Sequence, residues 1–139
     1  MKRIGWLATA ILFAGCGTGP SEPGGDREFI LESLNESSLP YDHEGLGCCI
    51  YLGGSLQLQG NDYTVSITAR NRNNNLVFTV REWGSFTEAA AQVTFVPEGF
   101  EIQPLLLDVA TVANGRIRVS FGGEGPGSPD QFRAVFHQE

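Results

Sequence analysis

Lysine is almost absent from this chain of 139 residues, and positive charge is scarce in general. The formal net charge of −7 includes Lys2 and Arg3, and without these two residues the balance falls to −9. The remaining seven arginines are scattered and form no basic cluster. A protein that binds nucleic acid needs a basic surface to displace counterions from the phosphates. The composition therefore excludes a nucleic-acid-binding protein and predicts an acidic, hydrated surface.

Long hydrophobic runs are also missing. The apolar segment at residues 4–14 is well short of the roughly 20 residues that a membrane-spanning helix needs. It follows two basic residues, and the small residues Ala14 and Gly15 stand directly before Cys16. This is the arrangement of a cleavable export signal. We therefore predict that residues 1–15 are a signal peptide.

Residues 12–16, with the sequence Leu-Phe-Ala-Gly-Cys, resemble the lipobox of bacterial lipoproteins. In that family the cysteine receives fatty acyl chains such as palmitate and becomes the mature N-terminus, so the resemblance assigns lipidation to Cys16. Several acyl chains anchor a protein stably, since each buried CH₂ group contributes about 0.8 kcal/mol. Residues 16–27 are rich in glycine and proline and are expected to form a flexible tether to the membrane. In some bacteria of that family, an aspartate directly after the cysteine signals inner-membrane retention. This chain has Gly17 there, so the resemblance implies the outer membrane of the bacterial cell envelope.

Helical periodicity is not sustained anywhere in residues 28–139. Apolar residues instead recur at every second position, which is the period of a β-strand, and Gly, Asn or Pro regularly interrupts them. Strands joined mainly by tight turns predict a single all-β domain. We expect an antiparallel up-and-down meander that closes into a barrel of approximately eight strands. An immunoglobulin-like β-sandwich is the alternative.

A long strand is predicted around the glycine pair Gly53 and Gly54. Two glycines inside a strand indicate a bulge or a sharp bend. The apolar residues on the two sides share one parity, so four side chains are expected on the same face: Ile50, Leu52, Leu56 and Leu58.

Asparagines at residues 71–75 predict the next turn, because their side chains mimic backbone turns and tolerate positive φ. The strand that follows is expected to direct Leu76, Phe78 and Val80 to one face. A separate short strand is predicted at residues 84–86. Pro97 is expected to end the strand after that, because proline cannot donate to a sheet.

Asn114 and Gly115 give the strongest hairpin signal, because a type I′ turn needs positive φ at both central positions. This turn is expected to join a strand at residues 105–112 to one at residues 116–121. A loop rich in glycine and proline follows at residues 122–130. The last strand is predicted to carry Phe132, Ala134 and Phe136.

Several segments resemble the small lipocalin-like domains found in bacterial lipoproteins. They are residues 29–35 with 39–40, residues 54–58 with 62–65, residues 84–87 with 92–95, and residues 132–133. The matching segments extend over nearly all of residues 28–139. The resemblance implies an up-and-down antiparallel barrel.

Cys48 and Cys49 are adjacent, which is unusual for an exported protein. If Cys16 is acylated, no third cysteine of the chain is left to pair with them. Three states are open: a vicinal disulfide, two free thiols, or a bridge to another molecule. The alternation of a strand would point one side chain inward and the other outward. No basic residue adjoins them to activate a thiol, so a structural role is favoured over a redox role.

Residues 41–44 gather polar groups in one loop: Tyr41, Asp42, His43 and Glu44. Contiguous ligands seldom converge on one ion, and the second histidine, His137, is close to the end of the chain. We therefore predict no metal site. The loop is instead expected at the mouth of the barrel, where its four residues are candidates for binding a ligand.

Motifs for catalysis are missing as well. The chain has no Gly-X-Ser-X-Gly motif, no phosphate-binding glycine loop before a helix, and no cysteine with an evident histidine partner. We therefore predict a protein that is not an enzyme and uses no cofactor. The bulk of the inward residues favours a packed structural or interaction scaffold. The alternative is the binding of a small hydrophobic ligand in the interior or mouth, since a barrel of eight strands can do either.

Overall fold

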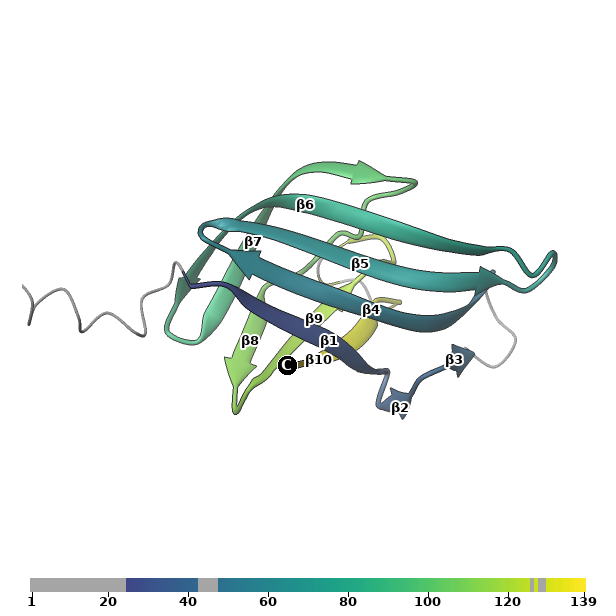
Figure 1. The fold of residues 1–139 in the computed structure, drawn as a ribbon, viewed down its shortest axis with the longest axis horizontal. Helices are drawn as coiled ribbons and strands as arrows, with labels where there is room; N and C mark the ends of the chain where they lie inside the picture. Colours follow the sequence, from purple (N-terminus) through teal and green to yellow (C-terminus); the bar gives the residue numbers. More distant parts are fainter. Residues whose placement is uncertain (1–24, 43–47, 126, 128–129) are drawn as a thin grey trace, which may run out of the picture.

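The computed structural model describes residues 25–42, 48–125, 127 and 130–139, in which every helix or strand assigned is a β-strand (Figure 1). The strands are β1 (Arg27–Leu34), β2 (Ser37–Ser38), β3 (Tyr41–Asp42), β4 (Cys49–Gln59), β5 (Asp62–Asn71), β6 (Val77–Ala89), β7 (Gln92–Glu101), β8 (Ala110–Ala113), β9 (Arg116–Phe121) and β10 (Phe132–Gln138). No helix in these ranges is long and apolar enough to cross a membrane. The predicted signal peptide, Cys16 and most of the predicted tether lie outside them.

Eight of the strands close into a barrel. From β4 to β10 each strand pairs antiparallel with the next, and β1 pairs with both β10 and β4. The short strands β2 and β3 pair with β1 and β4 and are additional to the closed wall. The predicted all-β antiparallel meander of eight strands is confirmed, and the sandwich alternative is wrong.

Alternation along the strands fills the barrel with side chains. Because successive residues of a strand point to opposite faces, every second residue enters the interior. Strand β5 is the clearest case, with four inward residues that are all buried: Tyr63, Val65, Ile67 and Ala69. The other barrel strands contribute in the same way, for example through Phe29, Leu56, Val80, Val93, Ala110, Ile117 and Phe136.

The bulge predicted in β4 is present, but it reverses the expected face of Ile50 and Leu52. The register of β4 on β5 shifts just after Tyr51. An extra residue changes the parity of the inward side chains across the bulge. Tyr51 therefore pairs with the buried Ala69 on the core side, whereas Ile50 pairs with Arg70 on the other face.

Strand β6 is continuous over 13 residues, whereas the sequence predicts two separate strands here. Gly84 lies within β6, where an added Cβ would come to 2.1 Å from the carbonyl oxygen of Val96. Glycine is needed at this position because the backbone of β7 approaches so closely. The prediction for Leu76 is also wrong: its backbone N–H donates to Asn74 Oδ1 in the preceding turn, and its side chain is 64% exposed.

Pro97 does not end β7, which continues to Glu101. The register of β7 on β6 shifts at this point, and Glu98 is the extra residue next to the pair of Pro97 and Gly84. A bulge leaves one residue out of the ladder and is one of the places where a strand accepts proline.

The strand predicted at residues 105–112 is much shorter than expected. Only Ala110–Ala113 form β8, and residues 102–109, which we call the strap, are irregular. Positive φ angles of 76° at Ile102 and 57° at Leu106 turn the backbone away from an extended path. Within the described part of the chain, β8 pairs with only the first two residues of β7.

The hairpin between β8 and β9 is confirmed. Asn114 and Gly115 have φ angles of 53° and 74°, the positive values that a type I′ turn requires. The strands pair from Ala113 and Arg116 outward.

Gly84→Ala is expected to lower the free energy of unfolding by about 2 kcal/mol, because the new Cβ overlaps the carbonyl oxygen of Val96. Gly53→Ala is a matched control in β4, since a Cβ there meets no atom within 4 Å. We expect it to change the free energy of unfolding by less than about 0.5 kcal/mol. Urea denaturation measures both, and equal effects would contradict the close approach of β6 and β7.

Candidate functional site

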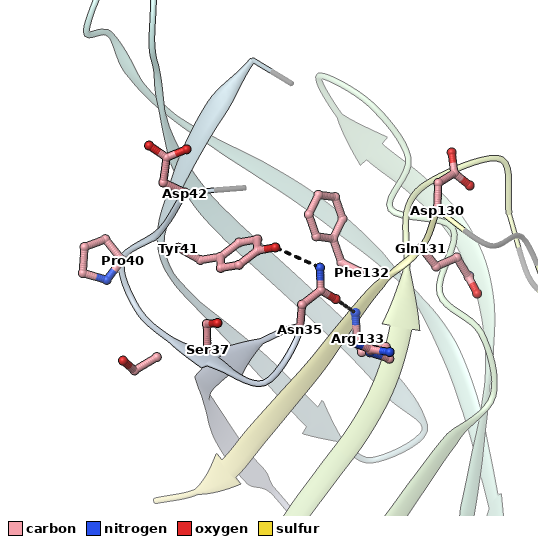
Figure 2. A pocket seen from close by; sticks show the side chains of 10 residues that line it. Asn35, Ser37, Pro40, Tyr41, Asp42, Asp130, Gln131, Phe132 and Arg133 are labelled. Carbon is pink, nitrogen blue, oxygen red and sulfur yellow. Dashed lines mark hydrogen bonds between the residues drawn. The ribbon is translucent and has the colours of Figure 1, made fainter. Parts of the chain in front are cut away.

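A cleft of about 910 Å³ lies at the end of the barrel where β1 finishes and β10 begins, and we call it the mouth cleft (Figure 2). Most of its lining side chains are polar: Asn35, Ser37, Ser38, Asp42, Asp130, Gln131 and Arg133. Tyr41 and Phe132 add two aromatic rings. Such a mixture of amides, hydroxyls, charges and rings suits recognition of a polar surface.

Asn35 connects the two sides of the mouth cleft. Its side-chain amide donates to the hydroxyl of Tyr41 at 3.1 Å, and its Oδ1 accepts from the backbone N–H of Arg133 at 2.8 Å (Figure 2). Its backbone N–H donates to the carbonyl of Arg133 at 2.8 Å. Asparagine suits this position because it tolerates the positive φ of 48° that follows β1. The contacts fix β3 against β10, so the cleft is formed without a ligand.

Aromatic rings separate the mouth cleft from the barrel interior. Phe132 lines both spaces, and its ring centroid lies 5.0 Å from that of Tyr51 and 6.4 Å from that of Tyr41. Phe121 stacks on Phe132 from the interior at 5.5 Å. Burial raises the pKa of the Tyr51 hydroxyl above its ordinary value.

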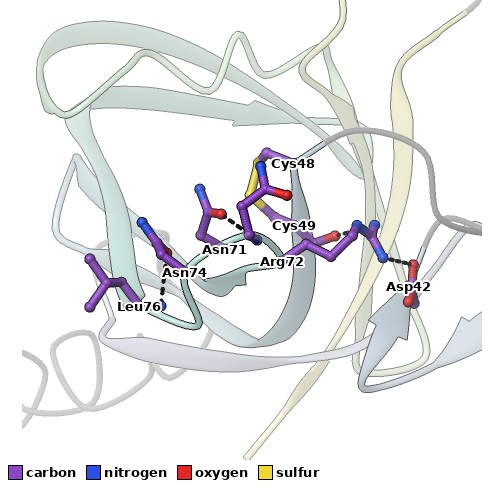
Figure 3. Close-up of a disulfide and its surroundings, with 8 residues drawn as sticks. Asp42, Cys48, Cys49, Asn71, Arg72, Asn74 and Leu76 are labelled. Carbon is purple, nitrogen blue, oxygen red and sulfur yellow. Dashed lines mark hydrogen bonds and ion pairs between the residues drawn. A yellow bond between two sulfur atoms is a disulfide. The ribbon is translucent and has the colours of Figure 1, made fainter.

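Cys48 and Cys49 form a vicinal disulfide, the first of the three states left open by the sequence (Figure 3). Cys49 is buried and Cys48 is exposed. Arg72 lies beside this pair: its guanidinium donates to the carbonyl oxygen of Cys49 at 3.2 Å and forms an ion pair with Asp42 at 2.6 Å. The turn after β5 is thereby connected to both β4 and the mouth cleft.

Little room is left inside the barrel. The cavity behind the rings is about 130 Å³ and is lined mainly by apolar groups, among them the disulfide, Tyr51, Ile67, Phe78, Val80 and Phe121. Sites that hold a drug-sized ligand measure about 300 Å³ or more. The part of the barrel interior behind the rings is therefore packed by its own side chains.

Glu82 is a buried acid in the wall of the barrel, and its side chain is only 1% exposed. Its Oε1 accepts a hydrogen bond from the Tyr63 hydroxyl at 2.8 Å, and its Oε2 accepts from the backbone N–H of Leu105 at 3.0 Å. The second bond holds the strap to β6. Sequence reasoning missed this residue, although Glu82 shares its parity with Val80 and Phe86 along a single continuous strand.

The surroundings of Tyr63 make its hydroxyl a weaker acid than that of an exposed tyrosine. Burial, and next the hydrogen bond to Glu82, raise the pKa of its hydroxyl above the ordinary value. The phenol therefore remains an O–H donor to Glu82 further into the alkaline range than an exposed tyrosine would.

A second hollow, the lateral pocket, opens through the wall between β7 and the strap. Its volume is about 480 Å³. Its apolar lining consists of Phe95, Pro97, Phe100, Pro104, Leu106 and Leu107. Glu82 and Glu98 are its acidic members. The pocket exists because the strap leaves most of β7 without a strand neighbour on that side within the described ranges.

The predicted loop residues are only partly placed. Tyr41 and Asp42 line the mouth cleft, but they form the short strand β3 on β4 and not the predicted loop. His43 and Glu44 lie outside the described residues. His137 is on β10, in the half of that strand away from the mouth cleft. In the part of the chain that the structure describes, no three His, Cys, Asp or Glu side chains are grouped so as to hold a metal ion.

The fold and its hollows define a closed antiparallel β-barrel of eight strands with a packed interior. No family model, curated protein or solved structure matches this chain. The likeness to a known protein class therefore rests on the sequence motifs and on the barrel architecture.

Tyr63→Phe is expected to lower the free energy of unfolding at pH 7 by about 1–2 kcal/mol, because Glu82 loses a buried donor. The substitution should also change the pH dependence. The raised pKa of Tyr63 stabilises the native state below pH about 10, and this contribution is lost as the pH rises further and the unfolded chain loses the proton.

Urea denaturation between pH 7 and pH 11 measures both effects. The wild-type protein should lose stability above pH about 10 more steeply than Tyr63→Phe. Parallel curves for the two proteins would contradict the environment assigned to Tyr63.

Proposed function

We propose that this chain is a bacterial envelope lipoprotein, anchored in the outer membrane through Cys16, whose lipocalin-like barrel is a non-catalytic interaction scaffold. The packed interior is the observation that carries the proposal. A cavity of about 130 Å³ has no room for a drug-sized ligand. Recognition is therefore assigned to the outer surface, and the preformed mouth cleft is the surface with the most varied polar groups.

The direction of β1 supports this assignment. The predicted tether leads into Arg27, which pairs with Leu58 near the turn between β4 and β5. The residues that line the mouth cleft begin at Asn35, directly after the other end of β1. Figure 1 shows β2 and β3 at this end of β1. A barrel anchored through residues 16–27 would thus present the mouth cleft away from the membrane, where a partner in the aqueous phase can reach it.

The lining of the mouth cleft favours a protein partner. Ser37 and Ser38 are exposed, and Gln131 and Arg133 offer further hydrogen-bonding groups on the facing side. Interfaces between proteins combine such groups with aromatic side chains, here Tyr41 and Phe132.

The binding of a small hydrophobic ligand is the second candidate function. The cavity behind the rings is too small for such a ligand, and the mouth cleft is mainly polar. Among the described residues, the lateral pocket is the hollow whose size and apolar lining favour this alternative.

Cys16→Ser is expected to abolish acylation and to move the protein from the membrane fraction to the soluble fraction, because the acyl chains supply the anchor. Fractionation and intact-mass measurement detect the two effects. Thr18→Ala is the control in the same segment and should remain acylated and membrane-bound. A Cys16→Ser protein that stays in the membrane would show that the anchor is assigned wrongly.

A photo-crosslinking amino acid at Ser38 tests the mouth cleft directly in intact cells. We expect it to capture a discrete protein partner, because Ser38 is exposed at the cleft. The same group at Ala90, exposed in the turn between β6 and β7, is the control and should capture much less. Equal labelling from both positions, or none from either, would argue against the mouth cleft as the recognition surface.

A further inference from the structure

The lateral pocket leaves apolar side chains open to water. Phe100 pairs with Glu82 across β6 and β7, so its ring belongs to the inner face, yet it is 51% exposed. Leu106 on the strap is 38% exposed on the other side of the pocket. Grouped apolar surface of this kind marks a site where an apolar group binds. The occupant should therefore have an apolar body.

Glu82 supplies a buried acidic group within this lining. Its two hydrogen-bond donors, the Tyr63 hydroxyl and the Leu105 N–H, are both neutral. The ion pairs found among the described residues all involve other acids: Glu88, Asp42, Glu101 and Glu32. A carboxylate offers about four acceptor positions, so two of them are left after these bonds. A buried carboxylate without a counter-ion is unfavourable, which makes a cation the complementary group.

Glu98 places a second acid at the rim of the same pocket. It is exposed and is the bulge residue of β7, so its side chain is independent of the ladder. Two acids around an apolar pocket repel an anionic amphiphile such as a fatty acid and attract an ammonium group. The charge of the site thus selects between amphiphiles of equal length.

We propose that the lateral pocket binds a small amphiphilic amine, with its hydrocarbon body against Phe95, Phe100 and Leu106 and its ammonium group directed to Glu82. The volume of about 480 Å³ falls in the usual range of about 300–1,000 Å³ for small-molecule sites. The proposal goes beyond the scaffold function and does not depend on the membrane anchor.

Octylamine, 1-octanol and octanoate test the proposal as probes of equal chain length and different charge. Calorimetry on the full chain with Cys16→Ser measures their binding without competing acyl chains. In a Trp6→Phe background, fluorescence of Trp83 gives a second readout, because this ring packs against Gly99 of the pocket. Octylamine should bind at least about tenfold more tightly than 1-octanol, and octanoate should bind most weakly.

Glu82→Gln keeps the size of the side chain and removes its acidic group, so it should weaken octylamine binding about tenfold more than it weakens 1-octanol binding. Glu101→Gln is the matched control, since Glu101 pairs with Arg81 and does not line the pocket. It should change octylamine binding less than about twofold. Phe100→Ala, at a half-exposed position that the fold can spare, should weaken octylamine and 1-octanol equally, by about fivefold.

Three results would overturn the proposal. They are octanoate binding as tightly as octylamine, octylamine affinity unchanged by both Glu82→Gln and Phe100→Ala, and no binding of octylamine at millimolar concentration. The first result would show that charge does not select the ligand. Either of the other two would show that the lateral pocket is not the binding site.

Discussion

The pairing of β1 with both β10 and β4 closes the sheet, and the rest of the architecture depends on this closure. An open meander of this length would expose the backbone groups of two edge strands and one apolar face. In the closed wall, Phe29 and Leu31 of the first strand pack with Phe136 of the last. Closure also fixes the two ends of the barrel, with Arg27 at one end and Asn35 at the other.

The buried acid explains why one part of the wall is open. The strap cannot form a regular ladder throughout, because Pro104 has no backbone N–H and two residues adopt positive φ. Glu82 accepts the N–H of Leu105 and so takes the place of a strand partner. The wall is therefore held at this point by a side chain, and the space left over is the lateral pocket. A structural contact and a candidate binding site depend on the same carboxylate.

Regular alternation made the barrel predictable, and local irregularities limited the prediction. Strand β5 alternates without interruption, so its inward residues follow directly from the sequence. The faces of Ile50 and Leu52 could not be predicted reliably, because the exact position of the bulge decides the parity and depends on pairing with β5. Leu105 illustrates a second limit: its place depends on Glu82, which is 23 positions away in the sequence.

The candidate sites also differ in how far the local sequence could predict them. Tyr41 and Asp42 could be placed at the mouth from the local polarity of their segment. The lateral pocket could not be predicted from the sequence, because its lining comes from three separate segments. Strand β6 supplies Glu82, β7 supplies Phe100, and the strap supplies Leu106. The strand period does mark Glu82 as an inward residue, provided that Gly84 is read as a point of close approach and not as the start of a new strand. An acid at an inward position of a barrel is unfavourable without a partner, so its presence in a continuous apolar pattern is the signal by which sequence reasoning could locate such a site.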